Sequence, residues 1–393
     1  MMSAVLSNPN HPKYGVATIP FPIPRDQYTY CMELLEALKI GDAVKADCKV
    51  EKIDSFYTVL KRTEMLTVNV EELNYLAKRL DSFDTGEAAQ FQAMAHKLEL
   101  FELKDLINLT FCCQQATVIT DFSDLAAVGR DHYMNLHGGS ASVDELNKLD
   151  GEETARRLIE NGSGKITPYG VVYDNGMKLE QIYDGRFFPC YYYEPNTITV
   201  AVTSKSEPED TNHITWLFLP MGQEEIDCGL LRGGITDAAD VRLRLEDSQL
   251  PNEVDVLLDM EYETLSDLNE LAEATDRLSE ADMEKLGAVV TLAEPKSAAQ
   301  IKNLAEHLDL FDFAPGAHTP EEYGKYMIRQ SGHFEYDENL DAFYDYEKYG
   351  TERMNAEDGM FTDRGYIAYK GYYNMEEVMN GGQSNHMVMR GMM

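Results

Sequence analysis

Basic residues are scarce in this chain, and acidic residues outnumber them two to one. The 393 residues include 34 Lys and Arg against 69 Asp and Glu, which gives a net charge of −35 at pH 7. Nucleic acids and anionic membrane surfaces attract positively charged proteins, so we expect no direct binding to either. A basic partner protein is favoured instead. With 44% hydrophobic residues, the composition is that of a globular protein and not of a disordered one.

Long apolar runs and paired cysteines are also missing. No run of about 18 apolar residues exists, so we expect no membrane span, and the first ten residues lack the pattern of a signal peptide. The six cysteines form no Cys-x-x-Cys pair and no zinc spacing, which is typical of reduced thiols. We therefore expect a cytoplasmic protein.

Motifs of catalysis and cofactor binding are absent from the sequence. There is no phosphate-binding glycine loop, no dinucleotide fingerprint, no Gly-x-Ser-x-Gly and no His-Glu-x-x-His. His132 and His137 lie five residues apart beside Asp131, a spacing that we interpret as loop or packing and not as a metal site. We expect no catalytic residue, no metal and no cofactor.

Similar segments recur 195 residues apart, which suggests a tandem duplication. Leu73–Ala77 resembles Leu268–Ala272, and Gly164–Val172 resembles Gly359–Ile367 at the same distance. Repeats of this kind predict copies of one structural unit. We therefore expect an α+β fold of two tandem elongated modules, each with small antiparallel sheets flanking a helical block. The modules are residues 1–195 and 196–380, followed by a flexible tail at 381–393.

The two predicted modules differ in charge. Residues 1–195 contain 29 acids and 19 bases, whereas residues 196–393 contain 40 acids and 15 bases. Within one helix predicted over Glu263–Glu284, leucines cluster on one side and acids on the other. Like charges three and four residues apart destabilise a helix. A requirement for stability alone therefore does not explain this acidic face.

The acids continue beyond this helix and make up the candidate partner-binding surface. Its predicted members are Glu263, Asp267, Glu270, Glu273, Asp276, Glu280, Glu284, Glu321, Glu322, Glu335, Asp337, Glu338, Asp341, Asp345 and Glu347. One interpretation is the solvated surface of an acidic protein. The other is imitation of DNA, which carries one negative charge per about 1.7 Å of its axis. Carboxylates at comparable density would occupy a basic DNA-binding groove by using its Lys and Arg side chains.

Four segments of the second half resemble the ArdA antirestriction proteins of conjugative elements. They are Trp216–Pro220, Leu265–Leu271, Tyr323–Gly332 and Asp345–Gly350, and the Gly359–Ile367 hairpin follows them. The motif residues that we single out are Tyr326, Gly332, Tyr346, Tyr349 and Gly350.

The resemblance implies an elongated DNA mimic that inhibits type I restriction-modification enzymes by occupying their DNA-binding groove, without catalysis or cofactor. Family members are usually single modules that form homodimers, so the chain either forms a homodimer or is a pseudo-dimer by itself. The first half departs from the family pattern, because Gly151 and Thr154 stand where the second half has Tyr346 and Tyr349. Three alternatives stay open: a mimic that inhibits another nuclease or a nucleoid protein, an acidic structural scaffold, and a hydrolase with a carboxylate site.

Overall fold

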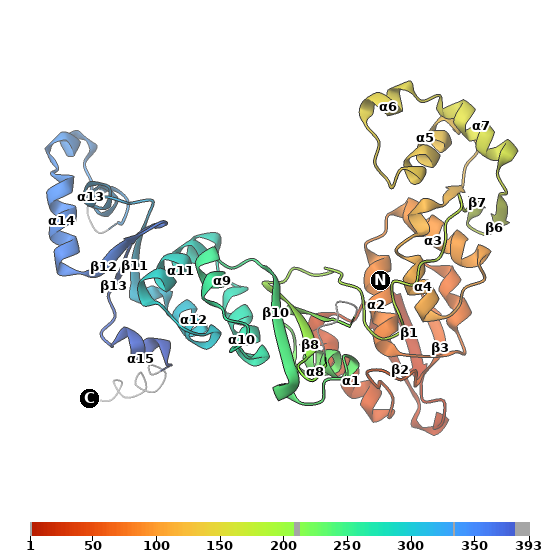
Figure 1. The fold of residues 1–393 in the computed structure, drawn as a ribbon, viewed down its shortest axis with the longest axis horizontal. Coiled ribbons are helices and arrows are strands. Elements are labelled where there is room, and N and C mark those ends of the chain that lie inside the picture. Colours follow the sequence, from red (N-terminus) through yellow and green to blue (C-terminus); the bar gives the residue numbers. More distant parts are fainter. Residues whose placement is uncertain (1, 208–212, 333–334, 382–393) are drawn as a thin grey trace. The chain divides into compact units, whose positions relative to one another are not determined.

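The computed structural model of the chain describes residues 2–207, 213–332 and 335–381 (Figure 1). The chain divides into two compact units. Unit 1 comprises Met1–Glu194, Ser206–Trp216 and Gly222–Asp240, and unit 2 comprises Pro195–Lys205, Leu217–Met221 and Val241–Met393. Beyond Gly381, the predicted C-terminal tail lies outside the described residues.

Unit 1 begins with a four-stranded antiparallel sheet in the order β2-β1-β3-β4. The strands are β1 (Met2–Ser7), β2 (Val16–Phe21), β3 (Cys48–Asp54) and β4 (Thr67–Val68), and helix α1 (Tyr28–Ala37) lies between β2 and β3 in the chain. Alternating residues of β1 and β2 are buried, as expected for a sheet with one face on the core.

A block of three helices follows: α2 (Val70–Asp81), α3 (Thr85–Lys97) and α4 (Leu103–Leu109). Side chains at the N-cap positions start the first two, since Asn69 accepts from the Glu72 N–H and Asp84 accepts from the Glu87 N–H. Apolar side chains of all three helices join the main hydrophobic core of unit 1.

A three-stranded antiparallel sheet in the order β5-β7-β6 closes this part of unit 1. Its strands are β5 (Thr117–Ile119), β6 (Lys165–Thr167) and β7 (Gly170–Tyr173), and helices α5 (Leu125–Leu136), α6 (Val143–Lys148) and α7 (Gly151–Asn161) lie between β5 and β6. The later helix α8 (Gln223–Arg232) also belongs to unit 1.

Unit 2 repeats this succession of sheet, helices and sheet. Its first sheet has the order β10-β8-β9, from β8 (Ile198–Ser204), β9 (Thr215–Leu219) and β10 (Val241–Ser248). The division between the units falls within β9, after Trp216. Helices α9 (Asn252–Leu257), α10 (Leu265–Thr275), α11 (Glu280–Ala293) and α12 (Ala298–Ala305) follow. The second sheet has the order β11-β13-β12, from β11 (Phe311–Pro315), β12 (Asp358–Thr362) and β13 (Gly365–Tyr369). Helices α13 (Pro320–Arg329) and α14 (Tyr346–Ala356) lie between β11 and β12 in the chain, and α15 (Met375–Met379) follows β13. The predicted α+β class with small antiparallel sheets is confirmed.

Corresponding elements of the two halves begin 195 residues apart. This holds for α2 and α10, α3 and α11, α5 and α13, α7 and α14, and β7 and β13. The turns that precede the last strands also agree: Gly170 and Gly365 both have a positive φ, and a Cβ there would lie 2.7 Å from Ile119 O and 2.2 Å from Ala314 O. Only glycine satisfies both the backbone conformation and the close approach at these positions.

Candidate acidic partner-binding surface

The predicted helix over Glu263–Glu284 is two helices. Helix α10 ends at Thr275 and α11 begins at Glu280. Ser279 starts the second helix, because its Oγ accepts from the Asp282 N–H at 3.2 Å and donates to Asp282 Oδ2 at 2.7 Å. The prediction of one continuous helix was therefore wrong, and its acids are divided between two helix faces and the turn that joins them.

The fifteen predicted acids are distributed over five elements and the segments between them. Helix α10 carries three, α11 two, α13 two, the 3₁₀ helix η7 (Glu338–Phe343) two and α14 one, while the other five lie between elements. Eleven are exposed and none is buried; the four half-buried ones are Glu263, Asp267, Glu284 and Asp341. The negative charge of this surface is thus in contact with solvent.

Several of these acids hold the local structure together. Both carboxylate oxygens of Glu263 accept from the Ala298 N–H at the start of α12, at 3.0 and 3.1 Å, and burial raises the pKa of Glu263. Asp345 is the N-cap of α14, and Glu322 accepts from the His318 N–H at 2.8 Å beside the start of α13. Their carboxylates serve as helix caps, which favours the structural interpretation for this subset.

Other acids of the surface are paired with bases. Glu270 lies 3.1 Å from Lys302 Nζ, and Glu321 lies 2.6 Å from Lys325 Nζ. Both pairs are largely exposed, where such contacts contribute little to stability. They reduce the local negative charge without removing it.

Asp341 lies in a cluster of side chains from α13, η7 and α14. It accepts hydrogen bonds from Tyr346, from Tyr336 at 2.7 Å and from the Arg329 guanidinium. The hydrogen bond from Tyr346 is the largest of the causes that lower the pKa of Asp341 to about 2. The Arg329 guanidinium also lies 5.3 Å from the ring centre of Tyr346. Its charge therefore compensates that of Asp341, which makes Asp341 a structural member of the surface.

Five of the other acids keep their charge available. Among the described residues, no side chain forms a hydrogen bond or ion pair with the carboxylates of Glu280, Glu338 and Glu347. Glu273 and Asp276 each accept one hydrogen bond from an uncharged side chain, Asn269 and Thr197 respectively. These five carboxylates are the best candidates for contacts with a basic partner.

The motif residues of the second half shape the contact between α13 and α14. A Cβ at Gly350 would lie 1.8 Å from Pro320 O, and one at Gly324 would lie 2.0 Å from Tyr346 O. Glycine at both positions lets the two backbones approach closely. Tyr326 and Tyr349 pack against the small core between these helices and the β11-β13-β12 sheet, and Gly332 has a positive φ of 75° just after α13. These residues therefore shape the part of unit 2 that carries the acids of α13 and α14.

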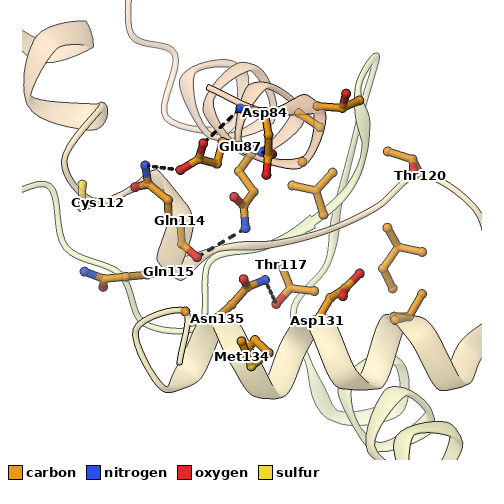
Figure 2. A pocket seen from close by; sticks show the side chains of 18 of the residues that line it. Asp84, Glu87, Cys112, Gln114, Gln115, Thr117, Thr120, Asp131, Met134 and Asn135 are labelled. Atoms are coloured by element: carbon orange, nitrogen blue, oxygen red, sulfur yellow. Dashed lines mark hydrogen bonds between the residues drawn. The ribbon is translucent and has the colours of Figure 1, made fainter. Parts of the chain in front are cut away.

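Unit 1 contains a groove that the sequence did not indicate. It has a volume of about 1290 Å³ and is lined by α3, the 3₁₀ helix η4 (Cys113–Gln115), β5 and α5 (Figure 2). We call it the α3–α5 groove. Its acids are scattered through the sequence between Asp84 and Asp131, and only the fold brings them to one place, so no spacing pattern marks them.

Metal-binding groups and membrane-spanning helices are both absent from the described part of the chain. No group of three or more His, Cys, Asp and Glu side chains there is arranged to hold a metal ion. None of its helices is both long and apolar enough to cross a membrane.

Comparison with known protein families gives one match. Residues 211–368 match the family described as Antirestriction protein (ArdA), a stretch that runs from just before β9 almost to the end of β13. It includes every one of the fifteen predicted surface acids. A comparison with curated proteins gives no match.

Proposed function

We propose that this chain, whose residues 211–368 belong to the ArdA antirestriction family, inhibits type I restriction-modification enzymes by imitating DNA. The acidic surface of unit 2 would enter the DNA-binding groove of the enzyme and exclude DNA from it. The chain would act in the cytoplasm, by binding and without catalysis. The observation that carries this proposal is that the family match coincides with a surface on which all fifteen predicted acids retain contact with solvent.

The physical basis is the positive charge of the target. A DNA-binding groove presents Lys and Arg side chains at positions suited to phosphates, and carboxylates accept charge-assisted hydrogen bonds from the same groups. Residues 196–393 carry 40 acids and only 15 bases, so a net negative charge remains after every internal ion pair is formed. Asp345, the N-cap of α14, fixes the helix that presents Glu347, which reduces the entropy lost on binding.

We also infer that residues 1–195 and 196–380 are two copies of one module. The common spacing of their helices and strands supports this inference, and so does a shared contact. Asn74 Oδ1 accepts from the Ile23 N–H at 2.9 Å, and Asn269 Oδ1 accepts from the Met221 N–H at 2.8 Å. In both halves the asparagine, on α2 or on its counterpart α10, connects that helix to the segment that follows the second strand of the sheet.

Plating of unmodified phage on a bacterial host with a type I enzyme tests the proposal. Expression of the chain should raise the plating efficiency, and the purified chain should block DNA binding by the enzyme. The informative variants are Glu280→Lys, Glu338→Lys and Glu347→Lys, because none of these carboxylates has an internal partner among the described residues. The matched control is Glu160→Lys, an exposed position on α7 of unit 1.

Each single reversal should weaken inhibition only modestly, by a factor of about five or less, and the triple variant should lose most of it. Raising the salt concentration should weaken binding as well. Loss of all activity through one carboxylate alone would indicate an active site and not a mimic. If the chain leaves type I enzymes active but blocks another nuclease or a nucleoid protein, the mimicry stands with a different target.

A further inference from the structure

The α3–α5 groove of unit 1 is open to solvent and polar. One wall is the N-terminal part of α3 with η4, the other is α5, and β5 runs between them (Figure 2). Its volume of about 1290 Å³ is ample for several side chains of a bound segment. The groove lies outside residues 211–368, so the family match does not account for it.

The charges that line the groove are mostly negative. Five carboxylates face a single base, Arg79. The Arg79 guanidinium is turned to the protein, because it donates to Thr110 Oγ1 and O at 3.2 and 3.1 Å and lies 4.4 Å from the ring centre of Phe111. The carboxylates are those of Asp84, Glu87, Asp121, Asp124 and Asp131.

Three of the four amide side chains of the groove add acceptors and not donors; the fourth belongs to Gln115. Gln90 Nε2 donates to Ala116 O at 2.7 Å, Asn135 Nδ2 donates to the same oxygen at 3.1 Å, and Gln114 Nε2 donates to Glu87 Oε1 at 3.2 Å. Because their NH₂ groups already donate within the protein, these three side chains present their carbonyl oxygens as hydrogen-bond acceptors for a ligand. The groove therefore suits a ligand that is rich in hydrogen-bond donors and positively charged.

Asp131 is the acid best placed to gain from such a ligand. It projects from α5 toward the groove (Figure 2). Within the described part of the chain, no side chain forms a hydrogen bond or ion pair with its carboxylate. Asp131 is exposed, yet neighbouring atoms desolvate its carboxylate and raise the pKa of Asp131, although the positive charge of the adjacent Arg130 acts in the opposite direction. A cation from a ligand would supply the missing partner.

The floor of the groove is an edge of a sheet. Strand β5 is an outer strand in the order β5-β7-β6, and Thr117–Thr120 line the groove. An outer strand leaves one row of backbone N–H and C=O groups for an additional strand, a common mode of peptide recognition. An extended peptide fits this floor better than a helix or a compact small molecule does.

The second half lacks this set of acids. The positions 195 residues after Asp84, Asp121, Asp124 and Asp131 hold Ser279, Gly316, Thr319 and Tyr326, and only Glu87 has an acidic counterpart, Asp282. The half with the smaller net negative charge thus concentrates carboxylates where the more acidic half does not. This contrast indicates a site particular to the first half.

We propose that the α3–α5 groove binds an extended, arginine-rich peptide segment of a partner protein. The segment pairs with the edge of β5, and its guanidinium groups donate to Asp131, Glu87 and the amide oxygens of the groove. Arginine suits the site better than lysine, because one guanidinium offers five donors in a fixed plane to several acceptors. The site gives unit 1 a binding role of its own, independent of the acidic surface of unit 2.

The test is fluorescence anisotropy of a labelled peptide of alternating arginine and valine, titrated with the full chain. A peptide with glutamate in place of arginine is the charge control, and unlabelled spermine is the competitor that represents a free polyamine. Asp131→Asn should weaken binding about tenfold, since it removes one charge-assisted contact without breaking an internal bond. Ala127→Trp, which fills the groove and leaves the charge unchanged, should abolish binding.

Two controls separate the groove from the general negative charge of the chain. Glu160→Gln removes one exposed carboxylate outside the groove and should leave the affinity unchanged. The triple variant Glu280→Lys, Glu338→Lys, Glu347→Lys should still bind the peptide even if it no longer inhibits restriction, so the two proposals fail separately.

Equal affinity of Ala127→Trp and the unaltered chain would overturn the proposal, provided that both unfold at the same urea concentration. So would an equal loss in Glu160→Gln and Asp131→Asn. Displacement of the peptide by spermine at a concentration equal to that of the peptide would show that the groove binds its ligand through charge alone. The proposed pairing of the peptide with β5 would then be wrong.

Discussion

Replacement of Arg232 by methionine should destabilise unit 1 strongly. Arg232 ends α8, and its side chain is 6% exposed. It donates to Arg186 O at 2.6 Å, to Ala43 O at 2.9 Å, to Asn69 Oδ1 at 3.1 Å and to the hydroxyl of Tyr183. Methionine keeps much of the apolar contact but offers no donor, so each of these acceptors loses one hydrogen bond, and among the described residues only Asn69 Oδ1 keeps another strong donor, the Glu72 N–H.

The expected loss in the free energy of unfolding follows from the carboxylate that Arg232→Met leaves without a positive charge beside it. Glu72 Oε1 lies 3.9 Å from the Arg232 guanidinium and accepts from the Tyr183 hydroxyl at 2.8 Å. Without Arg232 a mostly buried carboxylate has no positive charge beside it, and removal of one member of a buried pair typically costs about 3–5 kcal/mol. For a domain of this size, that loss corresponds to a fall in melting temperature of roughly 6–20 °C.

The measurement is urea unfolding followed by the fluorescence of Trp216. This residue is the single tryptophan of the chain and is the last unit 1 residue before Leu217 of unit 2, within strand β9, so far-UV circular dichroism is recorded beside its fluorescence. The matched control is Arg62→Met, an exposed arginine of the same unit, which should change the free energy of unfolding by less than about 0.5 kcal/mol. Adding Glu72→Gln to Arg232→Met should recover part of the loss, because it removes the uncompensated charge.

An equal and small effect of Arg232→Met and Arg62→Met would refute this reasoning. It would mean that water or a rearranged side chain satisfies the acceptors around position 232, and that apolar contact holds α8 in unit 1.

Three further predictions concern unit 2 and assembly. Gly350→Ala should destabilise unit 2 by about 1–3 kcal/mol in thermal unfolding, since its Cβ would lie 1.8 Å from Pro320 O, whereas Gly86→Ala should be neutral or slightly stabilising. The stabilisation from Asp341, whose pKa is lowered to about 2, should be complete above about pH 4 and should be lost as the pH falls toward 2. Tyr346→Phe should reduce this acid dependence in urea midpoints measured against pH. Light scattering at micromolar concentration should give a mass near 44.5 kDa, because two linked modules make a second chain unnecessary; a mass of twice that value that persists on dilution would contradict it.

The sequence predicted the features that depend on local pattern. The α+β class, the closing hairpins and the recurrence of elements after 195 residues follow from periodicity and from glycines such as Gly170 and Gly365. The break before α11 was missed, although Ser279 followed by Asp282 is a recognisable helix start, because the regular spacing of leucines and acids was given more weight.

Features that depend on tertiary contacts could not be predicted. Glu263 looked like any other surface acid, and only the position of α12 shows that it caps that helix. The acids of the α3–α5 groove come from α3, α5 and the segments before them, and no sequence spacing relates them. Conversely, exposure of the predicted surface acids was foreseeable, since an unpaired carboxylate is rarely buried.

The membership of α8 in unit 1 has a consequence for synthesis on the ribosome. The continuous part of unit 1 ends at Glu194, yet the unit is complete only after Asp240 has been translated. At about 5–20 residues per second, the ribosome needs roughly 2–9 s to make the intervening 46 residues. During that time the hydrogen bonds from Arg232 to Asn69 Oδ1 and to the hydroxyl of Tyr183 cannot form, so the first half emerges without the contacts that complete unit 1.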